Sequence, residues 1–357
     1  MGALSGDAYE AWVAGHDPQT GMPKGRLRGD GQAVRFVEVV INGPKSWSLL
    51  AELHPEIGTA YAAAQDRAAT QILAWLAQHA TTRVGPRGGQ VQIPVQRVEA
   101  AVVRHYTSRA GDPHRHLHLQ INARVRAEDR WLGLHTVGVR DSLDAINGMG
   151  HGAIVTDPQF RAALAGHGFT LTEDGEITQL AEYVGPFSAR AAQIGRNLDR
   201  YEADWRAAHP VEHPGPALRR GWDARAWAEN RPDKVIPASS DTLRGRWLHE
   251  LSQLGYRDSR RQPVPLRGCR VGGLDRDRSV QTVLARLAAR RSGWNTADIR
   301  GEVEQLLART LLVADAAVRT ELADDLTART VAACVPLLAR PGVPAHVRAL
   351  TSRHVLK

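Results

Sequence analysis

The sequence of 357 residues has little cysteine and no long hydrophobic run. Its two cysteines, Cys269 and Cys334, are too few for a disulfide framework or for a zinc site built from thiolates. No stretch approaches the roughly 20 consecutive apolar residues of a membrane span, and Met1–Gly21 lacks the apolar segment of a signal peptide. We therefore expect a cytoplasmic protein without membrane insertion.

The chain also contains no phosphate-binding loop of the form G-x-x-x-x-G-K-[ST], so we expect no bound nucleotide. Acidic residues are in the minority: 38 aspartates and glutamates stand against 46 lysines and arginines, which gives a formal net charge of +8. Most of the cations are arginines, whose guanidinium groups suit bidentate contacts to phosphate. The charge favours nucleic acid as a partner, although a GC-rich genome enriches arginine whatever a protein does.

What the sequence does contain is a mixture of strand and helix patterns. The β-branched segment 33–41 predicts a strand, and further strands are expected around 91–96, 98–106 and 116–125. Apolar spacing predicts a long helix over 56–82, and helices over 136–167 with a break near Asp157–Pro158, followed by a small hairpin over 168–179. Later helices are expected over 187–208, 217–229, 240–253, 276–291 and 298–339. The predicted fold class is α+β, with a helical C-terminal extension.

Four histidines stand close together in "RHYTSRAGDPHRHLHLQINARV", residues 104–125. Alternation along a strand places His114, His116 and His118 on one face, and a hairpin over 107–115 would bring His105 beside them. Three imidazoles on one face can hold a divalent cation and leave positions open for substrate and water. Spacing leaves the metal undecided, and the alternative is a set of solvated imidazoles on an amphipathic strand.

One acidic residue, Glu38, interrupts the apolar strand "RFVEVVI". A buried carboxylate normally needs a partner such as an imidazole N–H. The alternative is an exposed position at the edge of a sheet.

The segments "VEVVINGPKSWSLLAEL" and "RHYTSRAGDPHRHLHLQINARV" together resemble the TrwC/TraI-type conjugative relaxases, the MobF class of the HUH single-strand DNA endonucleases. The amino-acid sequence of the segment "WLGLHTVGVRDSLDAINGMGHGAIVTDPQFRAALAGHGFTL" is similar to sequences of the actinobacterial branch of that family. The resemblance covers roughly residues 11–255.

This resemblance implies an antiparallel five-stranded sheet flanked by helices, in a relaxase-like domain over residues 1–258. Residues 259–357 resemble the linker that precedes a helicase domain in longer members. The implied partners are single-stranded DNA at a transfer origin and other conjugation proteins.

The resemblance also assigns roles to residues. His105, His116 and His118 match the three ligands of one divalent ion, which would be Mg, Mn, Zn or Ni. Glu38 stands where the family has an aspartate that orients one histidine, and His114 has no counterpart among the ligands. The expected phosphate contacts come from Lys45, Arg104, Arg109, Arg115 and Arg124, for each of which the alternative is a solvated surface charge.

In this family the metal polarises a phosphate that a tyrosine attacks, and two tryptophans, Trp47 and Trp131, are candidates for stacking on bases. The family's nucleophilic tyrosines precede the segment that resembles "LSGDAYEAWVAGHDPQTG", so we expect neither Tyr9 nor Tyr106 to be the nucleophile. Three functions therefore remain open: a strand transferase whose tyrosine is not in this chain, an inactive protein that binds single-stranded DNA, and a three-histidine hydrolase that uses metal-bound water.

Overall fold

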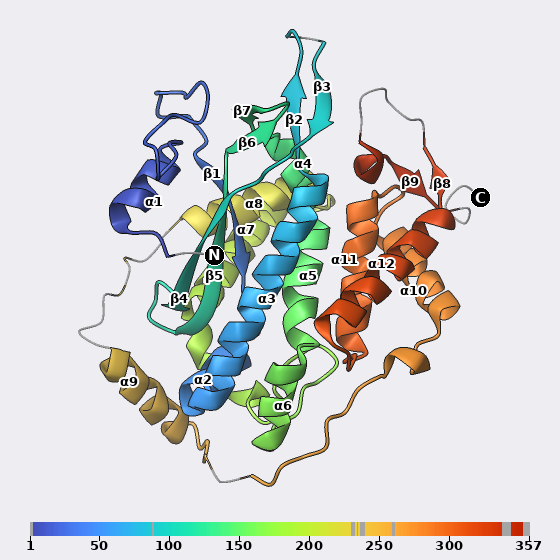
Figure 1. The fold of residues 1–357 in the computed structure, drawn as a ribbon. Coiled ribbons are helices and arrows are strands. Elements are labelled where there is room, and N and C mark those ends of the chain that lie inside the picture. Colours follow the sequence, from blue (N-terminus) through green and yellow to red (C-terminus); the bar gives the residue numbers. More distant parts are fainter. Residues whose placement is uncertain are drawn as a thin grey trace.

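A three-stranded antiparallel sheet forms the centre of the molecule (Figure 1). Its order is β1 (Phe36–Ile41), β5 (Pro113–Asn122) and β4 (Ala100–Thr107), so β5 is the middle strand. Helices α2 (Lys45–Leu53) and α3 (Pro55–His79) cover one face of this sheet. The computed structural model describes residues 3–87, 89–229, 233, 235, 240–258, 261–337 and 344–352.

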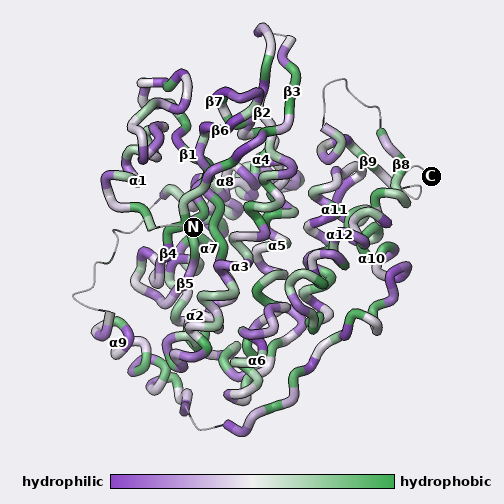
Figure 2. The backbone as a smooth tube through the Cα atoms, in the orientation of Figure 1, coloured by the Kyte–Doolittle hydropathy of each residue, from purple (hydrophilic) through white to green (hydrophobic). Residues whose placement is uncertain are grey.

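The hydrophobic core lies between β5 and α3. Leu117, Leu119 and Ile121, at alternate positions of β5, are at most 1% exposed and face this helix. Burial of each side chain contributes about 1.5–3 kcal/mol to folding. The alanine-rich sequence and Pro55 in the first turn favour the long helix that the sequence predicts. Figure 2 shows hydrophobic and hydrophilic residues alternating along the helices, as expected for elements with one buried side.

Trp47 of α2 belongs to this core. Its side chain is 0% exposed, its Nε1 donates to the carbonyl of Gly175 at 2.7 Å, and its ring meets the ring of Tyr61 edge to face at 5.5 Å. The proposed role of Trp47 in stacking on bases is therefore wrong, because the core already encloses both faces of the ring.

Helix α1 (Gly6–Val13) is attached to the far end of β5. The indole Nε1 of the buried Trp12 donates to Glu99 at 3.1 Å, and Asn122 donates from its side chain to the carbonyl of Trp12 at 3.0 Å. Both contacts join segments about a hundred residues apart, so they fix α1 against the sheet.

The five-stranded sheet is not confirmed, since the described sheet that carries the histidines has three strands. Two hairpins lie beside it, made by β2 (Thr81–Val84) with β3 (Val91–Pro94), and by β6 (Arg124–Ala127) with β7 (Arg130–Gly133). The predicted strand 116–125 ends at Asn122, because the chain then turns into the second hairpin. That hairpin closes through Glu128 and Asp129, whose φ angles are +47° and +57°. These residues carry no Asn-Gly signal, which is why the sequence did not reveal the turn.

The break predicted near Asp157–Pro158 is confirmed. Helices α4 (Thr136–Arg140) and α5 (Leu143–Val155) precede it, and the side chain of Asp157 then caps α6 (Pro158–Gly166) by accepting from two backbone N–H groups. The hairpin predicted over 168–179 reduces to a single bridge between Leu171 and Ile177. Two short 3-10 helices follow, at Ala181–Tyr183 and Pro186–Ser188.

The remainder of the chain is largely helical, as predicted. Its longer helices are α7 (Ala189–Ala208), α8 (Pro216–Ala228), α9 (Ser240–Gln253), α10 (Arg276–Arg290), α11 (Thr296–Arg309) and α12 (Ala316–Ala332). Its short elements are Val271–Gly273, β8 (Val335–Pro336), Ala345–Val347 and β9 (Leu350–Thr351). No helix in the described part of the chain is long and apolar enough to cross a membrane.

The single helix expected over 298–339 is wrong. The chain leaves α11 at Leu311, whose φ is +48°, and re-enters a helix at Ala316. Arg161 donates to the carbonyl groups of Leu311 and Leu312, which stabilises this interruption. Residues 338 and 339 of the expected helix lie outside the described residues.

The last three long helices enclose a second hydrophobic cluster, around Leu287, Trp294, Leu307 and Leu326. Helix α11 packs closely on α5, because a Cβ atom on Gly301 would lie 2.5 Å from the carbonyl of Asp144. The boundary expected between residues 258 and 259 stays a prediction.

Gly43 offers a test of this packing. A Cβ atom at this position would lie 2.1 Å from Cε3 of the buried Trp47, so Gly43→Ala should lower the free energy of unfolding by about 1–3 kcal/mol. Gly31→Ala is the control, since nothing lies within 4 Å of its Cβ position and a change within about 0.5 kcal/mol is expected. Urea unfolding measures both variants, and equal effects would contradict the packing described.

Candidate metal centre

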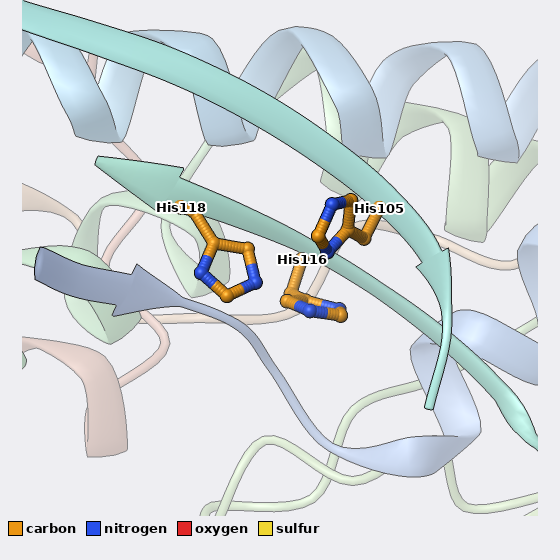
Figure 3. A group of neighbouring side chains, drawn as sticks. All are labelled: His105, His116 and His118. Carbon is orange, nitrogen blue, oxygen red and sulfur yellow. The ribbon is translucent and has the colours of Figure 1, made fainter. Parts of the chain in front are cut away.

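Three histidines meet on the face of the sheet opposite α3. His105 of β4 pairs directly with His116 of β5, and His118 follows two residues later on the same face. Figure 3 shows the three rings on the same side of the two neighbouring strands. One ligand nitrogen from each residue lies within 4.8 Å of the others. The structure thus confirms the predicted position of His105 beside the other two histidines.

Hydrogen bonds decide which nitrogen of two rings is free. His116 Nδ1 lies 2.7 Å from the carbonyl oxygen of His114, and His118 Nδ1 lies 3.0 Å from Oε2 of Glu38. Because a carbonyl or carboxylate oxygen only accepts, each Nδ1 carries the proton. Each Nε2 then keeps its lone pair, as a metal ligand requires.

Glu38 is held in turn by a chain of side chains. Gln120 Nε2 donates to Oε1 of Glu38 at 3.1 Å, and the Tyr9 hydroxyl donates to Oε1 of Gln120 at 2.5 Å. Burial raises the pKa of Glu38, but hydrogen bonds from Gln120 and His118 outweigh it and hold the pKa below its usual range. Sequence reasoning missed Gln120, although the alternation that picks out His116 and His118 reaches it next.

The two imidazoles deepest in β5 stay uncharged at neutral pH. Burial lowers the pKa of His116 to about 4; the hydrogen bond to the carbonyl of His114 raises this pKa, and the charges of His118 and His105 lower it. Burial also lowers the pKa of His114 to about 3, with a further contribution from the charge of Lys45. A neutral imidazole is the form that binds a cation, so His116 is available as a ligand at neutral pH.

The histidines open into a cleft of about 490 Å³ between the sheet and helices α7 and α8. Its opposite wall includes Arg190, Ile194 and Trp227. Trp227 is 59% exposed, and the Arg190 guanidinium lies 5.5 Å from its ring centroid. No pattern in the sequence predicts this wall, because α8 approaches β5 only in the folded chain.

Two of the five expected phosphate contacts line this cleft. Lys45 and Arg109 both face it, and Lys45 Nζ donates to the carbonyl of Pro113 at 3.3 Å. Burial lowers the pKa of Lys45, while the nearby Asp112 carboxylate raises it.

Arg104 and Arg115 lie on the other face of the sheet. Arg104 donates to Asp66 at 2.6 Å, and Arg115 donates to Glu52 at 2.8 Å, so both guanidinium groups fasten the sheet to its covering helices. Their positions alternate with those of His105 and His116, which explains the opposite orientation. This placement does not support the phosphate contacts expected of them. Tyr106 shares that face, where the Arg115 guanidinium lies 5.3 Å from its ring.

Arg124 is also used within the fold. Its Nε donates to the carbonyl of Lys24 at 2.8 Å and its Nη2 to the carbonyl of Trp131 at 3.1 Å. Lys24 Nζ in turn lies 5.2 Å from the ring centroid of Trp131. Neither Arg124 nor Trp131 lines the histidine cleft, so the structure gives no support to a DNA contact from either.

Comparison with known proteins gives one consistent result. The sequence model of the TrwC relaxase family matches residues 1–254. A metal-free structure of the conjugative relaxase TrwC in complex with oriT DNA is 20% identical, with a TM-score of 0.53 over 71% of this chain and 86% of that one. The metal-bound structure of that complex is 21% identical, with a TM-score of 0.53 over 72% of this chain and 85% of that one.

A TrwC complex with a 27-mer DNA that contains the recognition hairpin and cleavage site is 20% identical, with a TM-score of 0.54 over 72% of this chain and 88% of that one. At these identities the likeness concerns the fold. None of the curated protein sequences matches this chain.

The metal assignment can be tested by calorimetric titration with Mn²⁺, Ni²⁺ and Zn²⁺. The wild type should bind one ion per chain, and His116→Ala with His118→Ala should abolish binding because two of three ligands are lost. His213→Ala, which removes an exposed histidine far along the chain, is the control. Unchanged binding in the double variant would reject the site.

The role of Glu38 can be measured separately. Glu38→Gln keeps the shape but removes the charge that orients His118, and should weaken metal binding about 10- to 100-fold. Glu10→Gln is the control, since Glu10 is an exposed acid on α1. Equal affinities for the two variants would show that the carboxylate does not position the ligand.

Proposed function

This chain belongs to the TrwC relaxase family, and we propose that it binds single-stranded transfer-origin DNA at the His105, His116 and His118 site for nicking and strand transfer. One observation carries the proposal: three imidazoles, two of them with Nε2 freed by a hydrogen bond at Nδ1, converge at the floor of an open cleft. TrwC itself has been seen with oriT DNA in metal-free and metal-bound forms.

The site suits one divalent cation, of which Mg, Mn, Zn and Ni are candidates. A bound cation would supply Lewis-acid polarisation of a phosphate oxygen. Glu38 keeps the His118 ring in one tautomer and one orientation, and Gln120 keeps Glu38 in place. The protein therefore orients two of the three ligands, His116 and His118, before any ligand arrives.

The walls of the cleft fit a single strand. Lys45 and Arg109 place positive charge beside the histidines, where a phosphate would lie. The exposed ring of Trp227 offers a surface on which one base can stack, an interaction worth about 1–3 kcal/mol in other single-strand binders. A single strand exposes both its phosphates and the faces of its bases, so it can use both kinds of contact.

The chemistry proposed is phosphoryl transfer to a tyrosine. The tyrosine oxygen forms a bond to phosphorus, the bond from phosphorus to the 3′ oxygen breaks, and the proton lost by the tyrosine ends on the released 3′ oxygen. The products are a 5′-phosphotyrosyl link and a free 3′-OH, and the reverse reaction rejoins a strand.

We further propose that the nucleophile is not one of the six tyrosines of this chain. Tyr9 contacts Gln120 on the same face as the histidines, and its hydroxyl already donates to that side chain at 2.5 Å. The others are on the opposite face, in the core or farther along the chain: Tyr61, Tyr106, Tyr183, Tyr201 and Tyr256. The same observation favours a second candidate function, a DNA-binding protein that does not cleave.

Four finer expectations from the sequence are also part of the proposal. They are membership of the actinobacterial branch, a cytoplasmic location, contacts with other conjugation proteins, and a relaxase-like domain over 1–258 followed by an extension over 259–357. The end of the family match at residue 254 supports the domain boundary.

A single-stranded oligonucleotide carrying a fluorophore tests the function. We expect binding whose affinity falls steeply with salt, and Arg109→Gln should reduce the slope of log K against log salt by about 0.7, the value for one phosphate contact. Arg140→Gln, an exposed arginine on α4 outside the cleft, is the control. Absence of binding, or a flat salt dependence, would reject DNA as the ligand.

Incubation of the same oligonucleotide with the protein and Mn²⁺ distinguishes the candidate functions by their products. We expect little or no covalent adduct and an intact strand from this chain. An adduct mapped to Tyr9 would overturn the assignment of that residue, whereas cleavage that leaves a free phosphate end would indicate hydrolysis by metal-bound water.

A further inference from the structure

A second cleft, of about 590 Å³, lies where α5 meets α10 and α11, well outside the histidine site. The charged residues that line it are four arginines and two acids: Arg286, Arg290, Arg291, Arg309, Asp144 and Glu302. The lining thus carries an excess of two positive charges. It is built largely from the helical part that follows the family match.

The two kinds of arginine in this cleft differ in their partners. Arg290 pairs with Glu302, and Arg291 donates to Asp144 at 3.0 Å and to Asp298 at 2.9 Å. Arg286 and Arg309, by contrast, have no acidic partner among the described residues. The acids of the cleft are therefore already used, and two guanidinium groups are left without a counter-charge.

Arg286 is the more informative of these two because it is half-buried. Burial lowers its pKa, and the positive charges of Arg309 and Arg290 lower it further. A partly desolvated cation beside like charges raises the energy of the unliganded cleft. An anion between Arg286 and Arg309 would offset that cost, and a guanidinium fork fits two phosphate oxygens.

A third hollow of about 330 Å³ shares lining residues with this cleft and with the histidine cleft. Asn147 of α5 lines both the arginine cleft and this hollow, and Val40 and Asn42 line both the hollow and the histidine cleft. Each hollow therefore shares lining residues with the next. Residues of β4 and β5 line the histidine cleft, residues of β1 and α5 line the third hollow, and residues of α5, α10 and α11 line the arginine cleft. In Figure 1 α5 lies beside α11.

We propose that the arginine cleft binds backbone phosphates of the same single strand that enters the histidine site, several nucleotides away from the phosphate held there. The shared lining residues favour one continuous strand over a separate anion, because a flexible polyanion can pass from one hollow to its neighbour. This inference rests on the proposed function and assigns residues of α10 and α11 to DNA binding.

The test compares two oligonucleotides, one of about six nucleotides, enough for one cleft, and one of about 24. Arg286→Gln with Arg309→Gln should weaken binding of the long oligonucleotide about tenfold or more and reduce its salt slope by about 1.4. Binding of the short oligonucleotide should not change. Arg278→Gln, an exposed arginine on α10 outside the cleft, is the control and should not alter binding of either.

One further double variant and one further measurement separate a loss of DNA contacts from a loss of folding. Arg286→Lys with Arg309→Lys retains both charges and should restore most of the affinity for the long oligonucleotide. Mn²⁺ binding at the histidines should be unchanged in every variant, which reports an intact fold.

The outcomes separate this inference from the proposed function. If the wild type binds neither oligonucleotide, the proposed function fails, and the inference fails with it. If the wild type binds both and the glutamine double variant matches it, only the inference fails. Equal loss on the short and the long oligonucleotide would also overturn it, since that result would indicate a general effect of charge.

Discussion

The two-residue period of β5 is the constraint on which both the core and the site depend. Odd positions, such as Leu117 and Leu119, face α3 and are 0% exposed, while even positions carry the imidazoles to the other face. A slip of one residue would bury histidines among aliphatic side chains and expose leucines to water. Hydrophobic burial therefore fixes the register of β5, and the register fixes His105 opposite His116.

Hydrogen bonds between side chains orient the histidines that the register of β5 brings together. The chain from Tyr9 through Gln120 and Glu38 to His118 connects α1, β5 and β1. Each member is hydrogen-bonded to the next, so removal of one leaves its neighbour without that partner. A site of this kind is rigid because the same hydrogen bonds that orient the ligand also hold an N-terminal helix against the sheet.

The positively charged side chains fall into two groups, those that bond to other parts of the fold and those that line a cleft. Arg104, Arg115 and Arg124 each donate to groups inside the fold and stabilise contacts between elements. Lys45 and Arg109 instead line the histidine cleft, and Arg286 and Arg309 line the second cleft. The formal charge of +8 does not distinguish these groups. What matters for binding is which cations lack an acidic partner, and folding decides that.

The sequence by itself determined the pattern of strands and helices and the histidines that share a face. Both follow from local periodicity, which reads the same in any context. It did not determine the three-stranded order of the described sheet that carries the histidines. Nor did it determine that the chain leaves the helical conformation at Leu311 or that the core buries Trp47. Nor did it place Trp227 across the cleft from the histidines. These features depend on contacts between residues far apart in the chain, and only the tertiary structure brings such residues together.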